Sequence, residues 1–181
     1  MTEKLFRAVF LTFGFLIVWH CLHNITLSKF AKLENEAESL EVDSSKAVTT
    51  RERERQLDCL AKNIYYEARG ESFEGRVGVA MVTINRSNSG RFPGDICQVV
   101  YQKTVFDEKL VYQFSWLANP TRGVILYKSA YNESYEVAKK VLLEGFRLTS
   151  LKDALYFHND QVSPGWNHQR IAQIGHHVFY K

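Results

Sequence analysis

The sequence predicts a mainly helical α+β domain that follows an N-terminal membrane helix. Apolar residues recur at helical spacing after residue 57, and two short segments near the C-terminus alternate as strands do. An uncharged apolar run follows two basic residues at the N-terminus. With 181 residues, 45% of them apolar and 24% charged, the chain has the composition of one folded domain with an appendage. The net charge of +3 gives no support to nucleic-acid binding.

The N-terminal segment has the layout of a signal anchor. Lys4 and Arg7 precede an uncharged run over residues 8–22, and extension to Leu27 reaches the length of about 20 residues that a bilayer core requires. The basic flank favours a cytoplasmic N-terminus and export of the remainder. We therefore expect residues 1–27 to tether the protein to the inner (cytoplasmic) membrane, with the domain on the periplasmic or wall side. A cleaved signal peptide followed by secretion, and a buried helix of a soluble domain, are the alternatives.

A charged segment over residues 28–56 separates this anchor from the domain. It contains few large apolar residues, and its a/d spacing of apolar residues lasts for only two heptads, from Phe30 to Leu40. We expect a partly helical linker here and a domain over residues 57–181.

The domain is predicted to begin with two helices. Apolar residues at helical spacing define the first from Leu57 to Ala68, and Gly70 is its expected stop. Ser72 is the expected N-cap of the second helix, which ends at the sequence SNSG.

The rest of the domain is predicted to contain two more helices and two strands. A short helix is expected in DICQVVYQ, after the loop RFPGD. A longer helix is expected from Asn132 to Glu144, because its acidic start and basic end suit the helix dipole. ALYFH (residues 154–158) and HVFY (residues 177–180) alternate as short strands.

Two glutamates stand four residues apart in the sequence NIYYEARGE. With about 100° of rotation per residue, Glu67 lies at the edge of the apolar stripe, where partial desolvation raises its pKa. A carboxyl group that holds a proton near neutral pH is a candidate general acid, and a solvated or arginine-paired glutamate is the alternative. Glu71 lies beyond the expected stop at Gly70. It is either a second acid or, as we favour, part of the cap of the next helix.

Aromatic residues stand beside amides and hydroxyls in QFSW (residues 113–116) and YFHN (residues 156–159), and again at Trp166. Tryptophan and tyrosine faces stack on sugar rings, and amides bind sugar hydroxyl and acetamido groups. The same rings would equally build a hydrophobic core. The residues that would bind a saccharide substrate are Glu71, Gln113, Ser115, Trp116, Tyr156, His158, Asn159 and Trp166.

The three cysteines form no CxxC pair, which argues against a cysteine-rich zinc site. Exported cysteines usually oxidise, so we expect a disulfide between Cys59 and Cys97, with Cys21 in the membrane segment. A Cys–His nucleophile pair is the alternative.

Four histidines lie close together in the sequence, at positions 158, 168, 176 and 177. A metal hydrolase would use such a set, but no HExxH motif accompanies them. We therefore expect structural or hydrogen-bonding histidines and no metal.

Five segments in this order resemble the SleB-type cell-wall hydrolases, the family of the spore-cortex-lytic enzymes. They are CLAKNIYYEARGESFEGRVGVAMVTINR, RFPGDICQVVYQ, QFSW, ALYFHNDQVSPGW and IGHHVFY, and the resemblance covers about residues 57–181. It implies a lysozyme-like, mainly helical domain that cuts the glycan strands of peptidoglycan. A phage lysis enzyme or a bacterial wall-remodelling enzyme would both suit this layout.

The resemblance also implies a chemistry for Glu67, which matches the family's catalytic glutamate. A lytic transglycosylase would cleave between N-acetylmuramic acid and N-acetylglucosamine. Glu67 would protonate the glycosidic oxygen and then remove the proton from the muramic C6 hydroxyl, which attacks C1 and closes a 1,6-anhydro ring. This reaction requires no second carboxylate, metal or other cofactor, so Glu71 becomes a supporting residue.

Other functions remain open at the level of sequence. A muramidase would use water and a second carboxylate such as Glu71, and a non-catalytic wall-binding module would keep only the fold. A metal-dependent amidase is the remaining alternative. In each case the expected partner is peptidoglycan, and the protein is expected to be a monomer.

Overall fold

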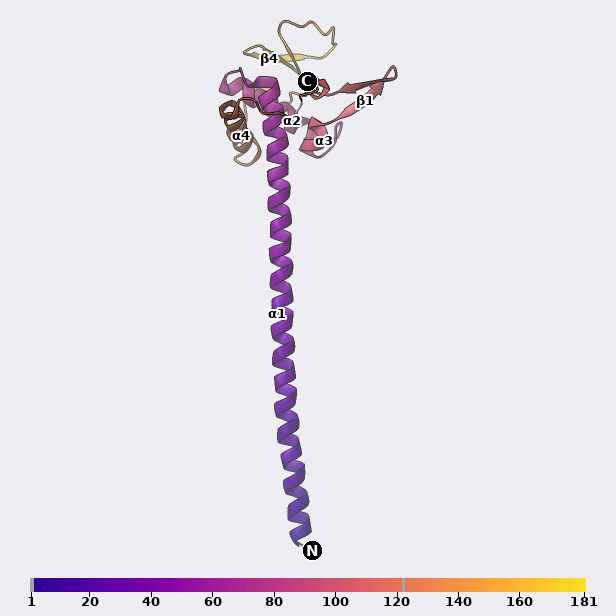
Figure 1. Ribbon diagram of the computed structural model, residues 1–181, viewed down its shortest axis with the longest axis vertical. Helices are drawn as coiled ribbons and strands as arrows, with labels where there is room; N and C mark the ends of the chain where they lie inside the picture. Colours follow the sequence, from indigo (N-terminus) through magenta and orange to yellow (C-terminus); the bar gives the residue numbers. More distant parts are fainter. Residues whose placement is uncertain (1, 122) are drawn as a thin grey trace. The chain divides into compact units, whose positions relative to one another are not determined.

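A computed structural model describes the backbone of residues 2–121 and 123–181, and the side chains of residues 19–20, 23–41, 49–121 and 123–181. The chain divides into two compact units, Met1–Thr50 and Arg51–Lys181. The long helix α1 (Thr2–Ala68) contributes to both units (Figure 1).

The first unit consists of α1 alone. Residues 28–56, expected to be a partly helical linker, are helical throughout, as suits their many glutamate, lysine, arginine and alanine residues. Its described apolar side chains, such as Phe30 and Leu40, are exposed. Where side chains are described, no helix combines the length and apolar character needed to cross a membrane. The expected anchor over residues 1–27 lies largely outside these side chains and stays a prediction.

The core of the second unit forms around the last turns of α1, against α2 (Phe73–Asn88) and α4 (Lys128–Leu142). α2 packs against α4 and also against the short helix α3 (Ile96–Val100). The predicted apolar stripe of α1 is confirmed, because its members are at most 2% exposed: Leu57, Leu60, Ala61, Ile64 and Ala68.

Helices α2 and α3 both begin at a capping side chain. The Ser72 hydroxyl accepts a hydrogen bond from the backbone N–H of Gly75 (3.2 Å), which confirms the predicted N-cap of α2. The Asp95 carboxylate accepts one from the N–H of Gln98 (2.9 Å) at the start of α3. Close packing follows along α2, where a Cβ on Gly78 would lie 2.5 Å from the ring of Phe179.

Helix α4 begins earlier than predicted, at Lys128 rather than Asn132, and ends at Leu142 rather than Glu144. Tertiary contacts explain the extra turn, since the Tyr131 hydroxyl donates a 2.6 Å hydrogen bond to Asp58 of α1. Two 3₁₀ turns, η1 (Ser115–Ala118) and η2 (Thr149–Leu151), flank this helix in the sequence.

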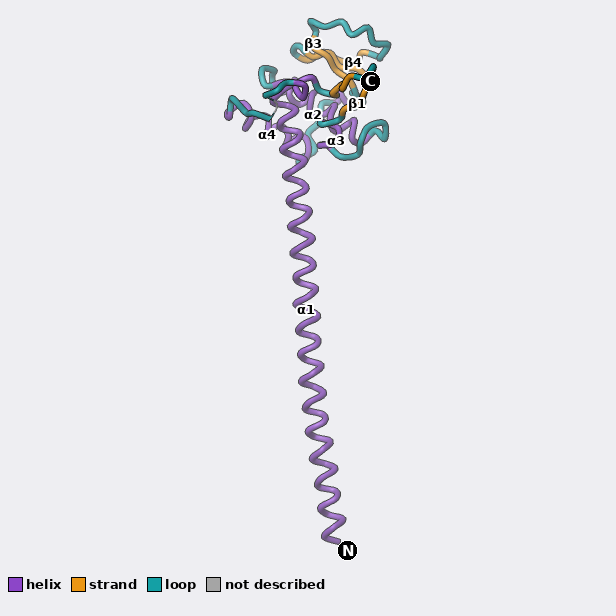
Figure 2. Tube along the Cα trace, turned by 45° about the vertical axis from the view of Figure 1, so that its right-hand side comes forward, coloured by secondary structure: helices purple, strands orange, loops and turns teal. Residues whose placement is uncertain are grey.

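Three strands form an antiparallel sheet in the order β3 (Tyr156–Asn159), β5 (His177–Tyr180) and β4 (Arg170–Ile174). Figure 2 shows β3 and β4 on one side of the helices α2, α3 and α4. The prediction of β5 is confirmed, whereas β3 begins two residues later than expected. The sequence analysis missed β4, which is interrupted by a bulge between Arg170 and Ala172.

A separate hairpin, also missed, pairs β1 (Lys103–Phe106) with β2 (Lys109–Tyr112). Its strands are short, and their exposed residues do not alternate between apolar and polar. Its turn residues Asp107 and Glu108 have φ values of 50° and 58°, a conformation that usually selects glycine or asparagine. The turn therefore carried no recognisable hairpin signal.

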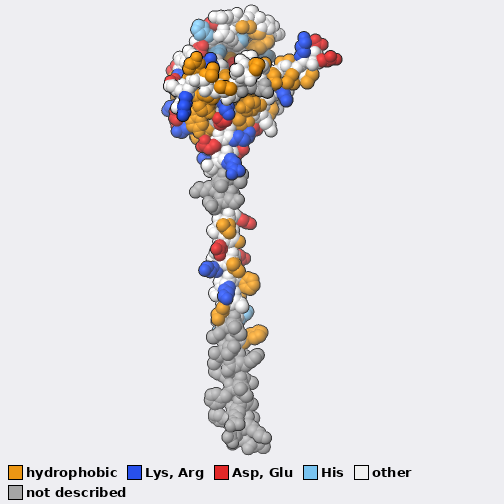
Figure 3. Space-filling view, viewed as in Figure 1, with side chains coloured by type: hydrophobic (Ala, Val, Ile, Leu, Met, Phe, Trp, Pro, Cys, Tyr) orange, Lys and Arg blue, Asp and Glu red, His pale blue; other side chains and the backbone are white. Residues whose placement is uncertain are grey.

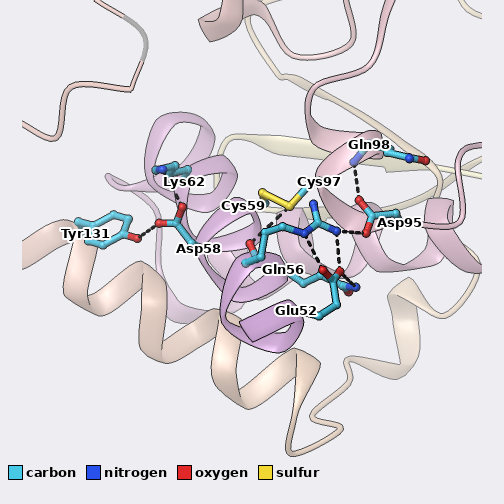
Figure 4. The surroundings of a disulfide bond; sticks show 10 residues. Glu52, Gln56, Asp58, Cys59, Lys62, Asp95, Cys97, Gln98 and Tyr131 are labelled. Carbon is cyan, nitrogen blue, oxygen red and sulfur yellow. Dashed lines mark hydrogen bonds and ion pairs between the residues drawn. A yellow bond between two sulfur atoms is a disulfide. The ribbon is translucent and has the colours of Figure 1, made fainter. Parts of the chain in front are cut away.

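The expected disulfide between Cys59 and Cys97 is present and joins α1 to α3 (Figure 4). Beside it, Asp58 accepts hydrogen bonds from Lys62 (2.7 Å) and Tyr131, so this part of α1 is also held to α4. The cross-link and these polar contacts fix the helix segment that leads to Glu67.

Replacing both cysteines by serine should lower the free energy of unfolding by about 2–4 kcal/mol, because the bond restricts the unfolded chain. Urea denaturation of the wild type and of the Cys59→Ser/Cys97→Ser variant, each with and without a reductant, measures this. The reductant should destabilise only the wild type; equal effects on both proteins would show that the bond does not contribute.

Candidate active site

A hollow of about 620 Å³ lies between the end of α1, α2, the β2–η1 connection and the β3–β5–β4 sheet. Glu67 enters it from α1, and Arg86 from α2. Of the described residues that line it, Glu67 is the sole carboxylate. The others are Gln113, Phe114, Ser115, Tyr156, Phe157, His158, Asn159, Val162, Trp166, His168 and His177.

One wall of the hollow is positioned by polar residues of α1. Asn63 is fully buried; its amide donates to Thr83 (3.1 Å) and accepts from the indole N–H of Trp116 (3.1 Å). The Tyr66 ring stacks on Trp116 at 4.4 Å, and its hydroxyl donates to the carbonyl of Val124 (2.8 Å). These contacts hold the β2–η1 connection against α1 and so place its side chains at the hollow.

The opposite wall is held by the end of α2. The Asn85 amide donates to the carbonyls of Leu151 (3.0 Å) and Ala154 (2.9 Å), and Arg86 Nε donates to that of Leu155 (2.7 Å). The backbone N–H of Leu155 donates to the carbonyl of Tyr180 of β5 (2.8 Å), so the anchored segment leads directly into β3.

Glu67 is half-buried at the rim of the core, as the helical stripe predicts. Burial raises the pKa of its carboxyl group to about 7, and the nearby charge of Arg86 opposes this rise. No hydrogen bond from the described residues engages the carboxyl group. The group can therefore carry a proton near neutral pH and give it to a ligand in the hollow.

Arg86 is only 3% exposed, and the sequence analysis did not single it out. Burial lowers its pKa to about 10, so the guanidinium stays charged at neutral pH. It lies 5.3 Å from the ring centre of Phe114 and 5.8 Å from that of Tyr156. With the amide of Gln113 turned so that its oxygen faces Arg86, that oxygen accepts from both terminal nitrogens at 3.1 and 3.2 Å.

Stacked rings cover the sheet side of the hollow. Tyr156 stacks on His168 at 4.1 Å, and His158 hydrogen-bonds the Tyr180 hydroxyl through Nε2 (2.8 Å). Trp166 meets both His158 and Tyr156 edge-on and is 43% exposed. Exposed rings beside amides form a surface suited to saccharide faces.

Three of the four histidines, His158, His168 and His177, line the hollow, and His176 lies in the turn between β4 and β5. His176 approaches Asp160 (3.4 Å), while His177 is buried between Phe157 and Phe179 with its Nδ1 unpartnered. Burial lowers the pKa of His177. Across the described part of the chain, no three side chains of the metal-ligating kinds gather.

Most of the expected substrate-binding residues lie together with Glu67 around this hollow. They are Gln113, Ser115, Tyr156, His158, Asn159 and Trp166. Trp116 instead lines another hollow, of about 380 Å³.

Glu71 lies away from the hollow and does not cap α2, which Ser72 caps. Its Oε2 accepts a 3.2 Å hydrogen bond from the backbone N–H of His176. The adjacent Gly175 has φ +57°, and a Cβ there would lie 2.0 Å from this oxygen. Glu71 therefore supports the turn between β4 and β5.

Several lining residues were missed by the sequence analysis: Arg86, Phe114, Phe157, Val162, His168 and His177. The signal for Arg86 is its place on the buried face of α2, where it follows Val79 and Val82 at i+7 and i+4. A cation on such a face indicates a function or a buried partner. His168 and His177 belonged to the histidine set that was expected to be structural. Phe114 and Phe157 stood inside the recognised motifs but were not assigned a role.

Comparison with known proteins identifies the family. Residues 70–180 match the model of the Cell Wall Hydrolase family, so the chain belongs to it. The spore cortex-lytic enzyme of Bacillus subtilis (strain 168) is 28% identical over 124 residues, 66% of this chain and 35% of that protein. The spore cortex-lytic enzyme of Oceanobacillus iheyensis is 32% identical over 129 residues, 69% of this chain and 41% of that protein. The chain thus spans less than half the length of these relatives.

Two solved structures share the fold. The catalytic domain of the Bacillus cereus SleB protein aligns with a TM-score of 0.53 and 25% identity, covering 71% of this chain and 91% of that one. The catalytic domain of the germination-specific lytic transglycosylase SleB from Bacillus anthracis gives 0.53 and 26%, covering 70% and 93%. The predicted resemblance to SleB-type hydrolases and the mainly helical α+β fold are confirmed.

Replacing Glu67 by glutamine should stabilise the protein at pH 8 but not at pH 4. Below pH 4.5 the Glu67 carboxyl group is protonated in both the folded and the unfolded state. Between pH 4.5 and about 7 it is protonated in the folded state but not in the unfolded state. Wild-type stability therefore falls by about 3 kcal/mol as pH rises through this range. The Glu67→Gln variant has no carboxyl group to titrate there and does not show this loss. Urea denaturation at both pH values measures this. Glu108→Gln, on the exposed hairpin turn, controls for the lost charge, and an equal gain at both pH values would contradict the explanation.

Proposed function

We propose that this protein cleaves the glycan strands of peptidoglycan between N-acetylmuramic acid and N-acetylglucosamine as a lytic transglycosylase. The observation that carries the proposal is the position of Glu67 as the sole carboxylate among the described residues that line the hollow. A transglycosylase needs one acid that later acts as a base. Family membership supports the same reaction class, and so does the likeness to the Bacillus anthracis catalytic domain, which is that of a lytic transglycosylase.

The proposed reaction uses one carboxyl group twice, first as an acid and then as a base. Protonated Glu67 gives its proton to the glycosidic oxygen as the bond from muramic C1 to that oxygen breaks, and the N-acetylglucosamine end leaves as an alcohol. The Glu67 carboxylate then takes the proton of the muramic C6 hydroxyl, whose oxygen bonds to C1 and closes the 1,6-anhydro ring. Glu67 regains its proton and no water is consumed.

In this cycle Arg86 supplies a fixed positive charge near Glu67. Beside a carboxyl group with a pKa of about 7, the guanidinium stabilises the carboxylate that forms when the proton leaves. The rings of Tyr156 and Trp166, with the amides of Gln113 and Asn159, supply surfaces that suit sugar rings and their acetamido groups.

The disulfide supports a location outside the cytoplasm, since such bonds persist in oxidising compartments. Together with the apolar N-terminal run, it supports an exported enzyme tethered on the wall side of the membrane. We include this location in the proposal.

The principal experiment compares wild type and Glu67→Gln on purified peptidoglycan. We expect Glu67→Gln to lower the rate by about 10²- to 10⁴-fold, because the general acid is lost. Mass spectrometry of the wild-type products should find 1,6-anhydromuramic ends, with activity retained in a chelator. Reducing muramic ends alone would instead establish a muramidase, and equal rates of the two proteins would remove Glu67 from the mechanism.

The pH dependence of activity tests the role of Arg86. Wild-type kcat/KM should fall as pH rises through about 7, because only protonated Glu67 is active. Removing the cation in Arg86→Gln raises the pKa of Glu67, so this fall should move to higher pH, whereas Arg86→Lys should keep it near the wild-type position. An unchanged profile in Arg86→Gln would show that the charge of Arg86 does not act on Glu67.

A further inference from the structure

Two further hollows lead away from the active-site hollow along the base of the β1–β2 hairpin. Gln113 lines both the active-site hollow and a second one of about 160 Å³. Lys103 and Tyr112 line this second hollow and also a third of about 380 Å³. We call the second and third hollows together the hairpin groove. Its lining residues are Tyr101, Gln102, Lys103, Thr104, Val111, Tyr112, Gln113, Trp116, Leu117 and Gly123.

The hairpin groove adjoins the active-site hollow that contains Glu67, because Gln113 lines both. Ser115 lines the active-site hollow and its neighbour Trp116 lines the third hollow. Consecutive Cα atoms are about 3.8 Å apart, so the two hollows are lined by adjacent residues of the chain. A polymer held beside Glu67 therefore has a second hollowed surface within reach.

Aromatic rings form the end of the hairpin groove. Trp116 is held rigidly, since its N–H is bound to the buried Asn63 and one face is stacked on Tyr66. Tyr101 meets Trp116 edge-on at 6.1 Å and is 43% exposed. Fixed rings lose little conformational entropy when a sugar stacks on them.

Polar groups complement these rings. The exposed side chain of Lys103 lies where the second and third hollows meet. Gln102 lines the second hollow, and its amide oxygen is buried without a hydrogen-bond partner. A cation, an unpartnered acceptor and stacking rings match a ligand that carries carboxylates, N–H groups and sugar faces.

The hairpin beyond the groove bears exposed apolar side chains, including Val105 (73%) and Phe106 (75%), and Figure 3 shows charged side chains at its tip. The turn carries Asp107 and Glu108 and is followed by Lys109, and these charged side chains at the tip oppose insertion into a lipid surface. The chemistry of the groove thus favours a polymer of sugars and peptides over a membrane.

We propose that the hairpin groove binds the peptidoglycan strand beyond the sugars held beside Glu67, with Tyr101 and Trp116 stacking on a sugar and Lys103 pairing with a stem-peptide carboxylate. This inference rests on the proposed function, and it makes long strands the preferred substrate. A short fragment that fills only the active-site hollow gains nothing from the groove.

The test compares long and short substrates with the full-length chain. Tyr101→Ala and Lys103→Gln should each lower kcat/KM on polymeric peptidoglycan about fivefold, the effect of one lost stacking or ionic contact. Both should leave kcat/KM on a soluble tetrasaccharide unchanged. Phe106→Ala, on the hairpin outside the groove, is the matched control and should change neither rate. Equal losses on both substrates, or no loss on the polymer, would overturn the inference.

Binding separates this inference from the proposed function. In a Glu67→Gln background, co-sedimentation with insoluble peptidoglycan should give a dissociation constant about fivefold higher for Tyr101→Ala than for Phe106→Ala. If Tyr101→Ala binds more weakly but the wild type cleaves nothing, the proposed reaction is wrong and the binding role of the hairpin groove still holds. Equal binding by the two variants would show that the hairpin groove does not bind peptidoglycan.

Discussion

Burial of the last turns of α1 is the constraint on which the domain depends. Leu57 to Ile64 form the centre of the core, and α2 and α4 pack around them. Glu67 follows Ile64 by one turn, so its partial burial comes from the same packing that stabilises the fold. The polar residues on this helix hold the surrounding walls: Asn63 holds Trp116, and Tyr66 holds the segment at Val124. The carboxyl group of Glu67 and the walls of the hollow around it are therefore both held in place by the last turns of α1.

Burial acts in opposite directions on the two charged groups of the hollow. It raises the pKa of Glu67 and lowers that of Arg86, because each loses the water that favours its charged form. Their mutual attraction works against both shifts. The result is a carboxyl group that changes its charge near neutral pH beside a guanidinium that keeps its own. A single acid beside a fixed positive charge is the arrangement on which the proposed one-carboxylate reaction is based.

Periodicity in the sequence was sufficient to predict the helical core and the place of Glu67 at its rim. It failed where distant contacts decide the structure. Arg86 acquires its surroundings from Leu155 and Phe114, which no local pattern connects to α2. Glu71 lies four residues from Glu67, yet its side chain binds the turn before β5. The β1–β2 hairpin was missed because its turn lacks glycine and asparagine, and its exposed strands show no burial pattern.

The contact between Glu71 and the turn at Gly175 couples two distant positions of the chain. A methyl group on Gly175 would collide with the Glu71 carboxylate, and the left-handed backbone there already disfavours other residues. Shortening residue 71 would remove the collision but also the acceptor for the His176 N–H. Substitutions at Gly175, in the turn before β5, are thus limited by Glu71 in the α1–α2 connection. Neither of these two residues lines the hollow. Sequence variation at the two positions is expected to be correlated, and a new side chain at one is tolerated only with a compensating change at the other.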